Sequence, residues 1–405
     1  IDFLSSAESG VPSQNLFDLA VKLEFADSTA FQTTTLTELS ATSLSALQGV
    51  ASRAGLANAQ FIQQRVSPGA LTQAISASPG QTSAGTALRA PPIAEASGNR
   101  SFDDREFALA ATRAIERQGA VSYFTGDDSV LRFVSAVSLH FDDSDTREGT
   151  VGFEQDGWSA SLAVEYENAS GRLVFGAAAT LGESDAEIEG ALGEANAQST
   201  GFGAYSSYTA GPVRLAAGLS FADLDLETSR RVLGASALGE TDANLTSIHA
   251  SATGFIVQDE GLSIGLKAAF DLQDLEIDAF AEAGAGDFSL SIPQLENDSS
   301  VLTLGAESEI GLELGDWQGA FFLEAGYQLA LSGDEFTALP VAFQADAGTS
   351  FSNPLRPLAN DGLRLRSALS LMSEGMLGLR LVYDGLFAQN GQTQNSVSAQ
   401  VSIAF

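Results

Sequence analysis

The 405-residue sequence predicts an all-β fold: a twelve-stranded antiparallel transmembrane β-barrel with an N-terminal α-helix through its lumen. Three observations predict this fold. Apolar and polar residues alternate from about residue 129 to the C-terminus, short and long connections alternate between the predicted strands, and a segment with helical spacing precedes them. Bacterial outer-membrane barrels combine such strands with short turns at one end and longer loops at the other.

The composition excludes several other classes of protein. Lys and Arg number 19 against 52 Asp and Glu, which gives a formal net charge of -33, and there is no cysteine. The absence of cysteine removes disulfides, thiolate metal sites and cysteine nucleophiles. The negative charge repels phosphate backbones, so we expect no nucleic-acid partner. No apolar run approaches the ~18 residues of a membrane-spanning helix. The chain starts at Ile1 without an apolar leader, so we expect a processed product or a fragment.

Two-residue periodicity is clearest in the last ten residues. Side chains alternate between the faces of a strand, so one face there carries only apolar residues and the other is mostly serine and glutamine. The apolar face consists of Val397, Ala399, Val401, Ile403 and Phe405. The same pattern predicts strands at 129–141, 157–167, 172–182, 198–209, 213–224, 244–257, 262–273, 300–314, 319–330, 363–373, 377–388 and 395–405.

The connections favour a barrel in a membrane. Five connections are tight turns with the sequences ENASG, AGP, QDEG, GDWQ and SEGM, and they alternate with long polar stretches such as 183–197 and 331–362. Every backbone amide must be paired inside hydrocarbon, and a closed barrel achieves this. We therefore expect short turns in the periplasm, long loops outside, apolar side chains toward lipid and polar side chains toward a wet lumen.

Two groups of side chains follow from that orientation. Aromatic residues near the strand ends predict girdles at the two membrane interfaces, namely Trp158, Tyr166, Tyr208, Tyr327, Tyr383 and Phe405. Charged residues of the inward phase predict a charged lumen wall, namely Glu307, Glu309, Glu313, Arg364, Arg366, Arg380 and Asp384. These charges either hydrogen-bond a helix in the lumen or set the ion selectivity of an open pore.

The residues before the barrel divide into three parts. Residues 36–66 have apolar residues at helical spacing, and about 45 Å of helix would cross a barrel of bilayer thickness. Residues 67–128 have the Pro/Ser/Ala-rich composition of a linker, although 101–118 is a second helix candidate and a rival for the lumen. Residues 1–35 are interpreted as the end of a passenger or a junction, and 129–405 as the outer-membrane barrel.

The sequence contains no recognisable catalytic motif. No GxSxG, HExxH or phosphate-binding loop occurs, so we expect no enzyme activity, no cofactor and no metal site. The two histidines, His140 and His249, fall on the inward face, which leaves a barrel-embedded hydrolase as a remote alternative. The acidic runs 142–145 and 183–190 could bind divalent cations, but such runs are usually solvated surface.

Several of these segments together resemble the translocator domain of autotransporters, the type V secretion family. The similar features are LTELSATSLSAL in the predicted lumen helix, FAEAG at 280–284, SVLTLGAESE at 300–309, LVYDGLF in the penultimate strand and the terminal VSIAF. The resemblance covers about 129–405 together with 36–66.

The resemblance implies a Gram-negative outer-membrane barrel that supports secretion and surface anchoring of its own N-terminal passenger. It also implies that the apolar C-terminal face ending in Phe405 is the signal read by the outer-membrane barrel assembly machinery, because strand addition to an exposed edge is a general mode of recognition. The partners expected are therefore outer-membrane lipid, this machinery and the passenger, with the barrel itself a monomer.

Three departures from the family pattern leave an alternative open. The linker 67–128 is long, residues 1–35 hold no passenger of meaningful size, and the predicted lumen helix lacks the Asn-Asn pair at which some relatives cleave themselves. A porin-like passive channel or structural barrel, with the first 128 residues as plug or periplasmic elements, is the alternative function.

Overall fold

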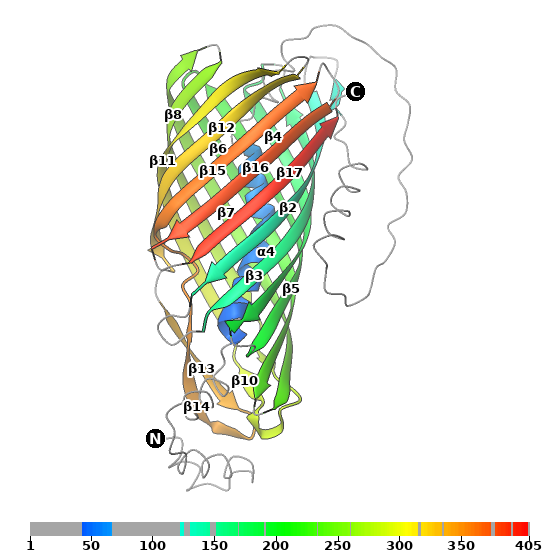
Figure 1. Cartoon of the computed structure of the whole chain (residues 1–405), viewed down its shortest axis with the longest axis vertical. Coiled ribbons are helices and arrows are strands. Elements are labelled where there is room, and N and C mark those ends of the chain that lie inside the picture. The colour runs from blue at the N-terminus through cyan, green and yellow to red at the C-terminus, as the bar shows by residue number, and fades with distance from the viewer. Residues whose placement is uncertain are drawn as a thin grey trace, which may run out of the picture.

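The computed structural model describes residues 43–66, 122–124, 130–145 and 151–403, except 169, 190–191, 233, 260, 315–316, 334–335, 374–376 and 390–391. The predicted junction 1–35, the helix candidate 101–118 and Phe405 lie outside the described residues. Within them the chain forms one large closed sheet, one small sheet and a long helix (Figure 1).

The large sheet is a closed barrel of twelve antiparallel strands, as the sequence predicts. Closure occurs between the first and last strands, because β17 pairs with β2 and β2 pairs with β3. The strands are β2 (Val130–Ser144), β3 (Phe153–Glu167), β4 (Leu173–Ile188), β5 (Gly193–Ala210), β6 (Val213–Val232), β7 (Ala235–Asp259), β8 (Leu262–Ile277), β11 (Leu295–Leu314), β12 (Trp317–Ser332), β15 (Gly362–Ser373), β16 (Leu377–Ala388) and β17 (Thr393–Ile403). A short strand, β1 (Ser122–Phe124), extends the sheet beside the start of β2.

The two ends of the barrel differ. At one end, here called the turn end, five short connections join the strands at 168–172, 211–212, 260–261, 315–316 and 374–376. The opposite end, here called the hairpin end, carries the remaining connections and lies at the bottom of Figure 1.

Strand lengths at the hairpin end were predicted wrongly. The segment 183–197, expected to be a long polar loop, mostly forms the end of β4 and the start of β5, and only 189–192 connects them. Likewise β6 and β7 continue to a tight connection at 233–234. A membrane-spanning strand needs about 9–11 residues, so much of the 20-residue β6 extends beyond a bilayer.

The physical reason for this error is visible along β6. In its first half Leu215, Leu219 and Phe221 face outward, while the inward face carries small residues such as Ser220. Beyond Phe221 the outward residues are Asp223, Asp225 and Glu227, and the inward residues include the buried Leu224 and Leu226. The two-residue period continues, but the apolar face changes sides, so a search for outward-facing apolar residues ends the strand too early.

The outward apolar band fits a lipid-facing surface. Large exposed apolar side chains lie on most of the barrel strands, including Leu162 at 59%, Phe175 at 54%, Leu266 at 60% and Leu381 at 53% exposure. Of the aromatic residues predicted at interfaces, Tyr166 and Tyr208 lie near the turn end, whereas Trp158, Tyr327 and Tyr383 lie toward the hairpin end.

The small sheet lies at the hairpin end. Two connections build it: 278–294 contains β9 (Phe280–Ala281), the 3-10 helix η2 (Gly286–Phe288) and β10 (Leu290–Ile292), and 333–361 contains β13 (Thr337–Phe343) and β14 (Asp346–Leu355). These strands pair in the order β14-β13-β10-β9. We call the residues 278–294 and 333–361 together the cap.

The helix α4 (Ser43–Val66) lies inside the barrel, as predicted for the 36–66 segment, and Figure 1 shows it running along the lumen. Its 24 residues give about 36 Å of length. Gln48 contacts Arg356 beside the cap, and Arg65 contacts Glu165 near the turn end, so the helix starts at the hairpin end. No helix among the described residues has the length and hydropathy needed to cross a membrane.

The change of faces along β6 predicts that one type of substitution has two different effects. Leu219→Arg should lower the free energy of unfolding by about 2–4 kcal/mol, because it places a charge on the lipid face. Asp225→Arg on the same face should be neutral or stabilising, since Asp225 lies opposite Asp242. Urea titration in lipid vesicles measures both. Equal losses at the two positions would contradict a membrane boundary near Phe221.

Candidate functional site

The candidate functional site is the lumen, because α4 and the inward side chains meet there. The helix packs closely on one side of the wall, against β3 to β7. The opposite side, formed by β8, β11, β12, β15 and β16, carries long charged side chains. The lumen therefore has a small-residue side that seats the helix and a charged side that spans the remaining space.

Glycines make the seat of the helix. A Cβ atom at Gly218 would lie 2.5 Å from Cγ2 of Ile62, and one at Gly203 would lie 2.7 Å from Cδ1 of Ile62. A Cβ atom at Gly201 would lie 3.1 Å from Cβ of Asn58. The absence of side chains at these positions lets α4 approach β5 and β6 closely.

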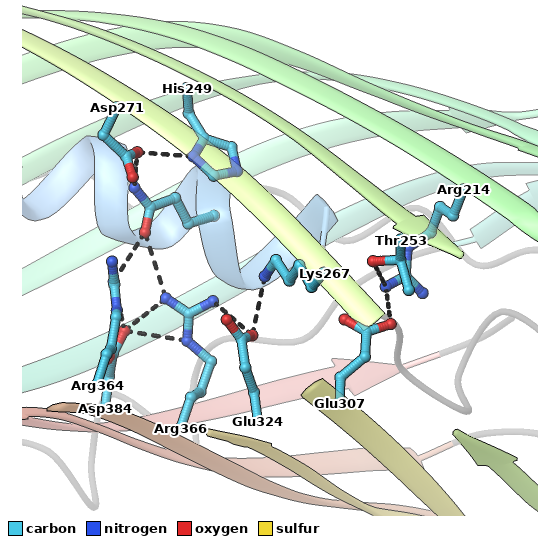
Figure 2. Close-up of polar contacts among 11 residues, drawn as sticks. Arg214, His249, Thr253, Lys267, Asp271, Glu307, Glu324, Arg364, Arg366 and Asp384 are labelled. Atoms are coloured by element: carbon cyan, nitrogen blue, oxygen red, sulfur yellow. Dashed lines mark hydrogen bonds and ion pairs between the residues drawn. The ribbon is translucent and has the colours of Figure 1, made fainter. Parts of the chain in front are cut away.

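The charged side forms a cross-strand row of three carboxylates and one arginine. Its members lie opposite one another on successive strands: Glu307 on β11, Glu324 on β12, Arg366 on β15 and Asp384 on β16. Figure 2 shows Glu324, Arg366 and Asp384 meeting Lys267 and Arg364 from neighbouring rows, whereas Glu307 points toward Arg214. Paired charges are the form in which ionised groups can be buried.

The distances show that the row and its neighbours form one linked set of ion pairs joined by Arg366. Nζ of Lys267 lies 2.9 Å from Oε2 of Glu324. The same oxygen of Glu324 lies 3.7 Å from NH1 of Arg366. Asp384 accepts from both arginines, with its Oδ2 at 2.5 Å from NH2 of Arg366 and 3.0 Å from NH2 of Arg364.

Gln63 connects the helix to this charged wall. Its Nε2 donates to Oδ1 of Asp271 at 2.8 Å, and its Oε1 accepts from Arg364 at 3.0 Å and from Arg366 at 3.3 Å. Asp271 also lies 2.7 Å from Nδ1 of His249. One amide thus uses both ends between a carboxylate and two guanidinium groups, which fixes the rotation and the axial position of α4.

Two arginines anchor the helix, one in its last turn and one at its middle. At the turn end, Arg65 forms a bidentate pair with Glu165, both contacts at 2.6 Å, and Tyr205 donates to the same carboxylate at 2.6 Å. Toward the hairpin end, Nε of Arg53 lies 3.0 Å from Oδ2 of Asp142. Both pairs are largely buried, so removal of one partner leaves an uncompensated charge.

The residues of the predicted charged lumen wall differ in their burial and in their ion-pair partners. Arg364, Arg366 and Asp384 form one group, but Glu307 pairs with Arg214 at 2.5 Å rather than with those arginines. Arg380 is buried, Glu309 is half-buried and Glu313 is exposed near the β11–β12 turn.

Sequence reasoning missed the residues that complete the site: Gln63, Arg65, Glu165, Arg214, Lys267, Asp271 and Glu324. Their strand members occupy inward positions of the two-residue period, which is the available signal. The register between strands, which decides the partners, is absent from the sequence.

Both histidines lie inside the barrel beside a polar partner. His140 is buried and lies 3.4 Å from the hydroxyl of Ser159, and His249 pairs with Asp271 inside the helix contact. In the part of the chain that the structure describes, no group of three or more His, Asp or Glu residues is arranged to hold a metal ion. Asp142 of the acidic run 142–145 forms an ion pair with Arg53.

The turn-end anchor predicts a non-additive effect on stability. Arg65→Gln should lower the free energy of unfolding by about 3–5 kcal/mol, because Glu165 then stays buried without its cation. Adding Glu165→Gln should recover part of that loss, since no buried charge remains. Denaturant titration of the two single variants and the double variant measures the coupling. Strictly additive losses would exclude a specific pair.

The close contact between these glycines and α4 predicts that a smaller side chain on the helix can offset a larger one on the wall. Gly218→Val should lower the melting temperature, because its side chain overlaps Ile62, and Ile62→Ala added to it should restore part of the loss. Ile62→Ala alone should also destabilise by leaving a cavity. Thermal unfolding of the three variants is the measurement. Failure of Ile62→Ala to help would place the effect of Gly218→Val outside the helix contact.

Comparison with known proteins agrees with this architecture. Residues 133–384, more than half of the chain, match the family profile described as Autotransporter beta-domain. No curated protein sequence matches the chain significantly.

Solved structures of three translocator domains align with the chain. The translocator domain of the autotransporter NalP from Neisseria meningitidis aligns with a TM-score of 0.54 at 15% identity, covering 73% of this chain and 94% of that domain. The β-domain of the Bordetella autotransporter BrkA gives 0.47 at 11% identity, with 68% and 98% coverage. The transport unit of AIDA-I from Escherichia coli gives 0.44 at 7% identity, with 67% and 90% coverage.

The fold match and the family match point to the same protein class. The closed twelve-stranded barrel with a helix in its lumen is that of an outer-membrane translocator. The chain belongs to the autotransporter β-domain family and is a translocator barrel of the bacterial outer membrane.

Proposed function

We propose that this barrel supports the secretion of its own N-terminal passenger and then anchors the chain at the cell surface. The observation that carries the proposal is the direction of α4. The helix starts at Ser43 at the hairpin end and ends at Val66 at the turn end, so its N-terminal end points out of the lumen at the hairpin end. With short turns in the periplasm, this end faces the exterior.

The contacts of α4 support a role as the remnant of a translocated segment. Its buried polar residues include Arg53, Gln63, Gln64 and Arg65, which bond to polar groups of the wall, and Gln48, which donates to the carbonyl of Arg356 in the cap. Such hydrogen bonds can be exchanged for water while a chain passes. The barrel works in this proposal without chemistry of its own.

The remaining segments take their places from the same proposal. Residues 1–35 are the passenger end or its junction, and 67–128 are a linker that returns the chain to the first strand. The C-terminal face of Val397, Ala399, Val401, Ile403 and Phe405 is read by the assembly machinery during insertion. On this face Val397 is 37% exposed, whereas Val401 is 7% exposed, so the described residues expose it only in part.

A porin-like channel is the second candidate, and the charged lumen side favours it, because charged walls also line aqueous pores. The filled lumen weighs against it. Gln63 occupies the space between Asp271 and the two arginines, where a conducting path would run.

Surface exposure of the N-terminus tests the proposal. The chain, supplied with an export signal and an epitope tag before Ile1, should bind a tag antibody on intact bacteria. The same tag at the turn 211–212 should become accessible only after the outer membrane is permeabilised. An assembled barrel whose N-terminal tag stays hidden would refute passenger secretion. Large, stable planar-bilayer currents from the native chain would favour the channel instead.

A further inference from the structure

Arg380 on β16 is a buried cation for which the described residues supply no counter-charge at contact distance. The residue is 4% exposed, and its Nε and NH2 atoms have no hydrogen-bond partner among these residues. The other Lys and Arg residues of the described inward wall and of α4 each form an ion pair with a carboxylate, namely Arg53, Arg65, Arg132, Arg214, Arg230, Lys267, Arg364 and Arg366. A charge is buried at low cost only when it is paired, so Arg380 offers a binding position for an anion.

The two atoms of Arg380 without a partner lie on the same edge of its guanidinium group. On that edge the N–H bonds of Nε and NH2 are parallel and match two oxygens of a carboxylate or a phosphate. Two other arginines of this lumen use the same edge. Arg65 donates to Glu165 from Nε and NH2, both at 2.6 Å, and Arg364 donates to Asp384 from the same atoms at 3.2 and 3.0 Å. Arg380 therefore presents the edge that holds a carboxylate elsewhere in this protein.

The position of Arg380 is near the turn end, where α4 ends. Ser370 on β15 and Gln400 on β17 lie opposite it on the neighbouring strands, and both are buried. Gln400 accepts from NH1 of Arg65, in the last turn of the helix, at 3.3 Å. Gly378, the inward residue between Arg380 and the turn end on β16, has no side chain. An anion that comes from the turn end thus meets no other inward side chain of β16 before Arg380.

The charges around Arg380 leave its edge unoccupied. They include Arg65, Glu165, Arg366 and Glu309. Arg65 and Glu165 pair with each other, and Arg366 belongs to the linked set of ion pairs described above. Glu309 is half-buried and accepts no hydrogen bond from Nε or NH2 of Arg380. It is therefore the carboxylate that repels an incoming anion or competes with it.

We propose that Arg380 is the binding group of a site for a small oxyanion, a carboxylate or a phosphate, at the turn end of the lumen. Nε and NH2 donate to two oxygens of the anion, and the amide of Gln400 and the hydroxyl of Ser370 are further donors on the neighbouring strands. Both guanidinium atoms are buried, so binding requires the arginine side chain to turn toward the turn end. The site requires only the folded barrel and does not depend on passenger secretion.

Thermal unfolding of the full chain in detergent micelles tests the site, with inorganic phosphate as the probe. At constant pH and ionic strength, replacing chloride by phosphate should raise the melting temperature of the native chain at least about 2 °C more than that of Arg380→Gln, because a ligand of the folded state stabilises it. The variant corrects for the general stabilising effect of phosphate. Broadening of the phosphate ³¹P resonance by the native chain and not by the variant measures binding directly. Equal responses of the two proteins would refute the site.

The melting temperature in chloride alone gives a second test. Arg380→Gln should then unfold at or above the temperature of the native chain, because it removes a buried charge that has no partner. A clearly lower temperature would mean that Arg380 has a partner within the folded chain, and it would contradict a site for an external anion.

Arg364→Gln is the matched control. Arg364 is an inward arginine whose equivalent edge is already occupied by Asp384, and Arg366 still pairs with Asp384 in this variant. Its response to phosphate should equal that of the native chain. If the response is lost here as well, phosphate is reporting the total charge of the lumen, and Arg380 is not the site.

Glu309→Gln separates a free anion from a carboxylate of the chain. It should enlarge the phosphate response, because it removes the neighbouring carboxylate that repels the anion. If a response that depends on Arg380 appears only in Glu309→Gln and is absent from the native chain, Glu309 itself occupies the edge. Arg380 and Glu309 would then be an internal ion pair, and the proposal would be wrong.

Discussion

The requirement that every backbone amide in hydrocarbon be paired governs the rest of this structure. A flat sheet would leave two unpaired edges in lipid, so β17 must return to β2 and the twelve strands must close. Closure in turn creates an interior that is wide enough for a helix and isolated from lipid. The polar side chains of the wall, the helix and their hydrogen bonds all follow from having such an interior to fill.

The same strands cross the membrane and continue into water at the hairpin end. In the membrane band the apolar side chains face outward, and beyond it they face inward while acidic residues face the water. This change of faces does not disturb the backbone, because the hydrogen-bond ladder continues without a bulge through Phe221 and Asp223 on β6. One end of the protein is built as a membrane barrel and the other as a water-soluble one.

The two sides of the lumen hold the helix by different contacts. Glycines on β5 and β6 allow close contact but offer no specific bonds, so by themselves they would let α4 slide or rotate. The charged side supplies the specificity, because Gln63 fits only where a carboxylate and two guanidinium groups converge. Glu324 and Asp384 keep those cations paired around it.

The sequence by itself determined the barrel, its strand number and the tight turns at one end, and it offered 36–66 and 101–118 as rival helices for the lumen. These depend on periodicity and turn residues, which are local properties of the chain. It also placed Arg364, Arg366 and Asp384 on the inward face. The tertiary structure decided what periodicity cannot: that Glu307 pairs with Arg214, that Gln63 joins Asp271 to Arg364, and that Arg230 meets Glu282 across 52 positions of the chain. Pairing depends on the register between strands and on the seating of the helix, and both are set by packing of the whole barrel rather than by any one segment.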